Sequence, residues 1–378
     1  MALYKILVKK VPISPEKKTK QKDYLPKGQL PIIDQGQQLI GGYSDNLDLQ
    51  LSCNPPVIVF GDHTRAVKYV DFPFGAGADG IKVLQPAEGV YPKFLYYATQ
   101  YLVLRLEDRG YARHYQYIEK KELDIPSVPE QKRIVARIEE LFSQLDNGVE
   151  TLRKTKQQLT VYRQAVLKSA FGKISPNEYK PLRSVLSGTP QNGLYKPKTA
   201  YGAGTRILRI DGFYDGRISE DYDYKRLQLS ESEIAQYQLN KWDLVINRVN
   251  SMQYLGKCAL IRDLSEITVY ESNMMRMKLD RTRVDPEYVT HYLSSFIGHK
   301  ELTKNAKQAV NQASINQTDV GNALIPVPES LEEQRNVVSA INARISVCDN
   351  IEKTVDTALQ QAEAMRQSIL KQAFKGRL

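Results

Sequence analysis

The chain has 378 residues, 42% of them hydrophobic, which is enough apolar material for two or three domains. Its net charge of +10 favours a polyanionic partner such as nucleic acid, although an ordinary basic protein fits the charge equally well. Three cysteines without CxxC spacing argue against a disulfide framework or a zinc site. The sequence shows no signal peptide and no run of about 18 apolar residues, so we expect a cytoplasmic protein with no membrane span.

The N-terminal third begins with a lysine-rich segment and continues as a β-rich domain. Residues 1–28 contain eight lysines, and Pro12 and Pro15 break any helix there, which fits either a phosphate-contacting arm or a solvated leader. Between residues 30 and 116, short apolar runs bounded by Gly, Pro, Asn and Asp indicate strands. Residues 92–110 are predicted to be a helix, with Pro92 at its start and Gly110 at its end.

Two polar clusters, residues 61–65 and 110–117, interrupt this domain. They combine hydrogen-bond donors with small or aromatic residues, which suits contacts to phosphates and base edges. A metal site at His63 is disfavoured because the four histidines show no HxH or HExxH spacing, which leaves a packed loop histidine as the other interpretation. The candidate DNA contacts from the two clusters, with the neighbouring lysine, are His63, Thr64, Arg65, Lys68, Arg113 and His114.

One stretch of the chain occurs twice. Residues 130–171 recur without a gap at 333–374, 203 positions later, and both copies begin with Glu-Gln and end with Ala-Phe. A proline-rich segment precedes each copy. So many matches indicate a duplicated unit, in which a globular domain is followed by a long helix.

Each copy carries apolar residues every seven positions, as a coiled coil does. A helix of this length, about 63 Å, cannot bury such a stripe alone. The two helices most simply pack on each other, or each packs on its own domain. We expect a second row at Ile134, Leu141, Gly148, Thr155 and Tyr162, and at Val337, Ile351, Ala358 and Met365, so that the seam is weak in its middle, around Gly148 and Thr155. The main row consists of Ile138, Leu145, Leu152, Leu159 and Val166, and of Ile341, Cys348, Val355, Ala362 and Ile369.

Residues 180–324 are predicted to form a second domain of strands, with a helix over 285–302 in the place that 92–110 occupies in the first. Asp285 is the expected N-cap and Pro286 the first helical residue. Its polar clusters are residues 247–251 and 311–317. Asn and Gln can bind adenine and Arg can bind guanine, although Asn-rich turns are usually only turns. The candidate contacts here are Asn247, Arg248, Asn250, Ser251, Asn311 and Gln312.

The sequence offers no catalytic motif. Residues 54–57 (NPPV) and 73–77 (PFGAG) superficially match two methyltransferase motifs, but valine cannot stack on a base and the glycine turn leads into a strand. A P-loop, a GxSxG elbow and an HExxH helix are all missing. The sequence therefore predicts a recognition protein without catalytic or metal-binding residues.

The layout of domain, IP-containing lead-in, EQ helix, second domain and second EQ helix resembles the specificity subunit of Type I restriction-modification systems. The resemblance covers nearly the whole chain and is most specific in VPEQKRIVARIEELF and LEEQRNVVSAINARI, followed by LKSAF and LKQAF. It implies an α+β fold with two mixed α/β target-recognition domains and two long helices paired as an antiparallel coiled coil with pseudo-twofold symmetry. The expected boundaries are 1–125, 126–174, 175–324 and 325–378.

The resemblance also implies a function. Each recognition domain would read half of a bipartite, gapped site in double-stranded DNA. Two modification subunits would dock on the helices, and restriction subunits would complete the complex. This chain would bind no cofactor, whereas S-adenosylmethionine, ATP and Mg would belong to the partner subunits. A solitary adenine-specific methyltransferase and a coiled-coil scaffold without a DNA role are the alternatives.

Overall fold

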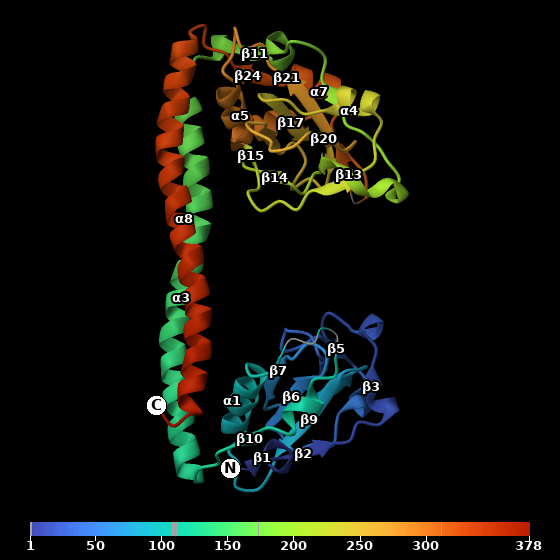
Figure 1. Ribbon diagram of the computed structural model, residues 1–378, viewed down its shortest axis with the longest axis vertical. Coiled ribbons are helices and arrows are strands. Elements are labelled where there is room, and N and C mark those ends of the chain that lie inside the picture. Colours follow the sequence, from blue (N-terminus) through green and yellow to red (C-terminus); the bar gives the residue numbers. More distant parts are fainter. Residues whose placement is uncertain (1, 108–109, 111, 173, 311) are drawn as a thin grey trace. The chain divides into compact units, whose positions relative to one another are not determined.

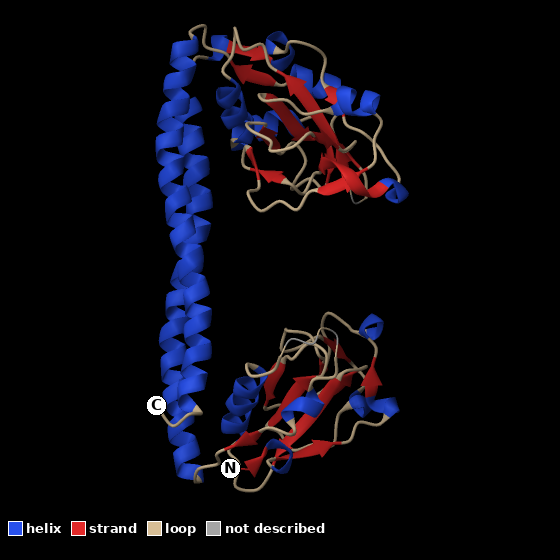
Figure 2. Cartoon of the chain, in the orientation of Figure 1, coloured by secondary structure: helices blue, strands red, loops and turns tan. Residues whose placement is uncertain are grey.

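The computed structural model describes residues 2–107, 110, 112–172, 174–310 and 312–378 (Figure 1). The chain divides into two compact units, Met1–Lys154 with Val355–Leu378 and Thr155–Thr354. Each unit contains one globular domain and a part of both long helices. Helices and sheets are mixed in both domains (Figure 2), which confirms the predicted α+β class.

The two copies of the repeat are the two long helices, α3 (Val128–Phe171) and α8 (Leu331–Ala373). In the second unit Lys156 pairs with Glu352 and Arg163 pairs with Asp349, so the helices run in opposite directions. In the first unit Asp146 pairs with Arg366. Asp146 and Arg366 occupy the same positions of the repeat as Asp349 and Arg163, and we call such residues repeat mates. The same acid–arginine contact therefore occurs once in each unit, which confirms the predicted antiparallel pair.

The main row of the predicted seam is buried, but the predicted second row is wrong. Ile138, Val166 and Ile341 are at most 4% exposed, whereas Ile351 is 40% and Met365 is 55% exposed. The second row lies one residue later than predicted. The members of the two rows with 8% exposure or less are Val135, Ile138, Phe142, Leu159, Val166, Val338, Ile341, Cys348, Val355, Ala362 and Ala373.

The remaining members of the predicted main row, Leu145, Leu152 and Ile369, are half-buried. Near the middle of the helices the corrected second row is charged, because it contains Lys156 and Glu352, which form an ion pair of 3.6 Å. Ion pairs, and not apolar side chains, therefore occupy the part of the seam where the sequence pattern is weakest.

The first domain has two four-stranded sheets, in the orders β2-β9-β6-β7 and β3-β8-β4-β5, and a small pair, β1-β10. Residues 1–28 supply the first three strands, and Tyr4 is fully buried, so the solvated-leader interpretation is wrong. The elements are β1 (Ala2–Leu3), β2 (Val8–Val11), β3 (Lys18–Thr19), β4 (Leu30–Ile33), β5 (Gly42–Ser44), β6 (Val57–Gly61), β7 (Val67–Val70), β8 (Gly75–Gly77), β9 (Ile81–Pro86), α1 (Pro92–Val103), α2 (Tyr115–Ile118) and β10 (Glu122–Leu123).

The second domain repeats this topology with more insertions. Its main sheet has the order β12-β21-β17-β19, antiparallel throughout like β2-β9-β6-β7, and its strands β16-β13-β20 repeat the antiparallel-then-parallel pairing of β5-β4-β8. The elements are β11 (Tyr179–Pro181), β12 (Gln191–Asn192), β13 (Tyr201–Leu208), β14 (Phe213–Tyr214), β15 (Arg217–Ile218), β16 (Lys225–Leu227), α4 (Glu231–Tyr237), β17 (Asp243–Asn247), β18 (Val249–Asn250), β19 (Cys258–Leu260), β20 (Thr268–Tyr270), β21 (Met274–Lys278), α5 (Pro286–Ser294), α6 (Phe296–Thr303), β22 (Lys307–Gln308), β23 (Ala313–Ser314), α7 (Gln317–Asn322) and β24 (Leu324–Pro326).

Two predicted helices are shorter than expected. The helix predicted over 92–110 ends at Val103, where tighter turns replace the helical hydrogen bonds. The helix predicted over 285–302 is two helices, α5 and α6, which meet at Ser295. The Ser295 hydroxyl accepts a hydrogen bond from the Gly298 amide at 3.1 Å, so it caps α6 and separates it from α5.

A buried glutamine joins each domain to the start of a long helix. Gln131 accepts a hydrogen bond from the Tyr91 amide, at the N-cap of α1, and donates to the Gly89 and Pro126 carbonyls. Its repeat mate Gln334 accepts from the Asp285 amide, at the N-cap of α5, and donates to the Arg283 and Pro328 carbonyls. The repeated Glu-Gln motif is thus a structural connection that is built in the same way twice.

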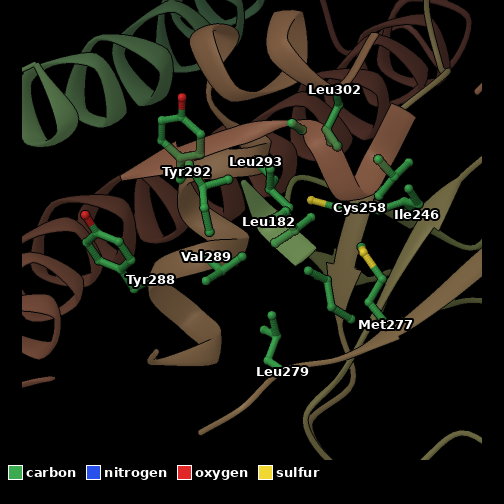
Figure 3. Close-up of a cluster of buried hydrophobic side chains, with 14 of the residues drawn as sticks. Leu182, Ile246, Cys258, Met277, Leu279, Tyr288, Val289, Tyr292, Leu293 and Leu302 are labelled. Atoms are coloured by element: carbon green, nitrogen blue, oxygen red, sulfur yellow. The ribbon is translucent and has the colours of Figure 1, made fainter. Parts of the chain in front are cut away.

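The terminal phenylalanines of the repeat enter the domain cores. Phe171 packs edge-on against Tyr288 and Tyr292 of α5, and Phe374 packs on Phe94 and Tyr101 of α1. Figure 3 shows part of this core, which contains Tyr288, Tyr292 and Leu293 of α5 together with the sheet residues Ile246, Cys258 and Met277. None of the described helices is long and apolar enough to cross a membrane.

Candidate nucleic-acid interface

In the first domain the two predicted polar clusters come together at Asp62, which directly follows the central strand β6. The Asp62 carbonyl accepts a hydrogen bond from the His114 amide at 2.8 Å, and its carboxylate accepts from the Tyr115 amide at 2.8 Å. Asp62 is buried, so these bonds are formed away from water. Residues 61–65 and 112–117 therefore form one cluster, which we call the first motif junction.

The second domain builds the same junction with different residues. Arg248 follows the central strand β17, and its carbonyl accepts a hydrogen bond from the Ile315 amide at 2.9 Å. Strand β18 pairs with β23 through Val249–Ser314 and Asn250–Ala313. The clusters 247–251 and 312–317 are thereby joined into the second motif junction. In both domains a short helix, α2 or α7, follows the returning segment.

The predicted contacts of the first junction differ in exposure. Thr64 and Arg113 are exposed, whereas His63 and Arg65 are half-buried. Arg65 adopts a left-handed backbone conformation with φ of 60°, and its Nε lies 3.3 Å from His114 Nε2. His114 itself is only 1% exposed, so it is placed to orient Arg65 and not to reach a ligand.

Lys68 is also removed from the surface. Its Nζ donates to the Asp34 carbonyl at 2.8 Å and lies 3.4 Å from the Asp34 carboxylate, and its side chain is 4% exposed. Burial lowers the pKa of Lys68, although Asp34 partly opposes that shift. The candidates Lys68 and His114 therefore serve the interior of the domain, because strand β7 and the returning segment turn them inward.

In the second junction Asn247 is fully buried and the other candidates lie nearer the surface. The Asn247 amide donates to the Ile210 and Tyr254 carbonyls, which makes it a structural residue of the loop. Arg248 and Asn250 are half-buried, and Arg248 donates to the Ser272 carbonyl at 3.0 Å. Ser251 and Gln312 are exposed, and Asn311 lies outside the described residues.

The sequence interpretation missed residues that border the junctions. Lys82 of β9 has its Nζ 3.6 Å from the Asp62 carboxylate. It stands between the buried Ile81 and Val83, so strand alternation was the signal for an outward-facing lysine. Met252, directly after the cluster of residues 247–251, is 42% exposed. As an apolar residue it carried no sequence signal for contact with DNA.

Neither junction contains the geometry of a metal centre. In the parts of the chain that the structure describes, His, Cys, Asp and Glu side chains do not gather in threes as metal ligands would. What the junctions present are hydroxyl, amide and guanidinium donors on loops that are anchored by buried backbone hydrogen bonds. Such an arrangement can bind phosphates and base edges by hydrogen bonding.

Comparison with known proteins shows which family the first domain is similar to. Residues 11–161 match the model of a family described as Type I restriction modification DNA specificity domain. The match covers the first motif junction and most of the helix α3, including Gln131.

Curated relatives extend the likeness beyond that domain. The chain is 29% identical over 269 residues to the Type I restriction enzyme EcoKI specificity subunit of Escherichia coli (strain K12), an alignment that covers 68% of this chain and 57% of that one. It is 27% identical over 267 residues to the StySPI specificity subunit of Salmonella potsdam, with the same coverage. The alignments thus span little more than half the length of these relatives.

A solved structure shares the fold. It is described as "Structural basis underlying complex assembly and conformational transition of the type I R-M system", and it matches 100% of this chain and 97% of its own with a TM-score of 0.68 at 16% identity. The two domains and the two long helices are therefore an architecture that a chain of distant sequence also adopts.

Proposed function

We propose that the chain is the non-catalytic DNA-specificity subunit of a Type I restriction-modification system, in which each domain reads one half of a bipartite, gapped duplex. The observation that carries the proposal is the duplicated motif junction, because the same strand order presents two different sets of polar side chains. A duplicated frame with unlike reading surfaces suits a target whose two halves have unlike sequences.

Two reading surfaces have a physical advantage over one. A mismatched base pair costs only about 1–3 kcal/mol, so a short half-site discriminates poorly against a genome. Joining two readers in one chain makes the second contact intramolecular and combines their discrimination. The net charge of +10 supplies the sequence-independent attraction to phosphates.

The long helices are the proposed docking surface for two modification subunits, with restriction subunits joining the same complex. Tyr162 is 49% exposed and its repeat mate Met365 is 55% exposed, so each copy of the repeat leaves a large apolar side chain outside the helix seam. Val347 and Ile351 add exposed apolar surface to α8. A partner helix would bury such residues. S-adenosylmethionine, ATP and Mg are assigned to those partners.

The experiment is methylome mapping of cells that express this chain with its modification subunit. We expect methylated adenines in one bipartite, gapped motif. Replacing residues 175–324 with the second domain of another such subunit should change only one half of that motif. A motif that stays the same after the replacement contradicts the proposal. Methylation by the purified chain alone would instead identify a solitary methyltransferase.

A further inference from the structure

The lysine-rich N-terminal segment is held rigidly against the first domain. The Tyr4 hydroxyl is 2.7 Å from Thr99 Oγ1 in the core, and strands β1, β2 and β3 pair with β10, β9 and β8. The lysines of this segment therefore project from an ordered backbone. Fixed positions distinguish them from the lysines of a mobile tail, because little conformational entropy is lost when they bind.

Three of the domain's lysines surround one cavity of about 280 Å³. Lys10 comes from β2, Lys18 from β3, and Lys82 from β9, so the cavity lies where both four-stranded sheets meet the turn before β9. All three side chains are between 37% and 55% exposed. Their ammonium groups are thus accessible to a ligand from solvent.

The acidic partners of these lysines lie at different distances. Lys18 is 3.5 Å from Asp79, whose side chain is 89% exposed, and Lys82 is 3.6 Å from Asp62. Only Lys10 has a short pair, 2.8 Å to Glu119. The Lys18–Asp79 pair is exposed, so it contributes little to stability and is screened by salt, and the Lys82–Asp62 pair is long although Asp62 is buried. An anion with higher charge density than a carboxylate can therefore compete for these lysines.

The cavity is continuous with the first motif junction. The Asp62 amide donates to the carbonyl of Gly80, which lines the cavity, at 2.6 Å. The Lys10 ammonium lies 4.5 Å from the ring centroid of Tyr115, whose amide is bound by Asp62. A duplex whose bases are read at the junction would therefore present a backbone phosphate near the three lysines.

We propose that Lys10, Lys18 and Lys82 form a binding site for a backbone phosphate of duplex DNA, beside the surface that reads its bases. The inference rests on the proposed function and deepens it. Lysine is a point charge without the planar fork of arginine, so the site recognises phosphate independently of sequence. It contributes affinity and salt dependence, whereas discrimination between sequences stays with the junction.

The test compares the full chain, bound to its modification subunit, with the variant K10Q/K18Q/K82Q. Dissociation constants are measured between about 50 and about 200 mM salt on a cognate and a scrambled duplex. Losing one phosphate contact lowers the slope of log K against log salt by about 0.9, which is a roughly threefold smaller loss of affinity over that range. The ratio of cognate to scrambled affinity is expected to stay unchanged.

Four matched variants separate charge from structure. Asp79→Asn and Glu119→Gln remove competing carboxylates and should tighten binding, the opposite sign to the lysine changes. The arginine variant K10R/K18R/K82R should restore the slope. Lys154→Gln removes a lysine from an ion pair with Glu150 on α3 and should leave the slope as it is.

The outcomes distinguish the two proposals. If the wild-type complex prefers its cognate duplex but the glutamine variant keeps the full slope, the phosphate site is wrong and the proposed function stands. If lysine and carboxylate variants weaken binding alike and both lower the melting temperature, the cluster is structural and the inference fails. If the wild-type complex binds both duplexes equally, the proposed function itself fails.

Discussion

The two units attach their domains to the long helices by the same central contacts but by different lateral ones. Gln131 and Gln334 make equivalent sets of hydrogen bonds, and Phe374 and Phe171 fill equivalent places against α1 and α5. The difference lies beside these anchors. In the second unit Asp349 accepts from Arg163 of α3 at 2.6 Å and from Arg217 of the domain at 2.8 Å.

The repeat mate of Asp349 contacts fewer elements. Asp146 binds Arg366 of α8, while the lateral contact of the first domain is Lys93 of α1 with Glu139 of α3 at 2.7 Å. The buried anchors and the acid–arginine pair between the helices were thus preserved when the unit was duplicated, whereas the ion pairs from each domain to the helix surface differ. A buried hydrogen-bonded group has few acceptable substitutes, whereas an exposed ion pair has many.

The largest loss of stability is expected when the two phenylalanines are replaced, and it should differ between them although they occupy the same position of the repeat. Phe171 is 1% exposed, whereas Phe374 is only half-buried. Phe171→Ala should therefore lower the free energy of unfolding by about 3–5 kcal/mol, and Phe374→Ala by clearly less. Urea denaturation of both variants measures the difference. Equal losses would mean that the two helix ends are packed alike.

Replacing either of the two buried glutamines should lower the free energy of unfolding by a similar amount. Either Gln131→Ala or Gln334→Ala leaves a buried backbone amide and two carbonyls without their partner, at a cost of about 2–3 kcal/mol. Hydrogen exchange localises the effect. Protection should fall at the start of α1 in the first variant and at the start of α5 in the second, and loss in the same unit for both would contradict the duplicated anchor.

Arginine substitutions in the two motif junctions should each weaken binding to a different half of the DNA site. Arg65→Ala and Arg113→Ala should weaken binding to one half of the cognate duplex, and Arg248→Ala to the other half, each by about 1–3 kcal/mol. Binding is measured on duplexes mutated in one half at a time. Assembly with the modification subunit serves as the control, and its loss together with DNA binding would assign a structural role to these arginines.

The smallest difference in stability is expected between variants of the ion-paired aspartates Asp349 and Asp146. Asp349→Asn removes two partly buried ion pairs and should cost about 1–2 kcal/mol, whereas Asp146→Asn removes a more exposed pair and should cost about 0.5 kcal/mol or less. Denaturation of the two variants under identical conditions measures the gap. Similar costs would show that the contact to Arg217 adds nothing.

The same contact predicts a pH dependence. Burial alone would raise the pKa of Asp349, but hydrogen bonds from Arg217 and Arg163 lower it below its ordinary value. The stabilisation is present above the pKa of an unfolded aspartate, about 3.9, and is lost as pH falls through the lower folded value. Wild type should therefore lose its advantage over Asp349→Asn below about pH 4, and a constant gap would contradict this assignment.

Much of the architecture could be predicted because the repeat is visible without structure. The offset of 203 residues, the main row through Ile138 and Ile341, and the strands that became β6, β9 and β17 were all readable from the sequence. The candidate clusters were also readable. What could not be read was which side chains in them face solvent: Lys68, His114 and Asn247 are polar and lie in loops or strands, yet all three are buried.

The sequence by itself determined that the chain is a duplicated unit of domain and helix, because repetition and apolar periodicity are properties of residue order alone. Only the tertiary structure decided which face of each helix is the seam. Ile134 and Val135 are both apolar, as are Leu141 and Phe142, so either row satisfies the heptad pattern. The first domain and α8 together bury Val135 and Phe142, and Phe142 contacts both Tyr97 of α1 and Arg366 of α8. Burial depends on what lies opposite a residue and not on its own hydrophobicity.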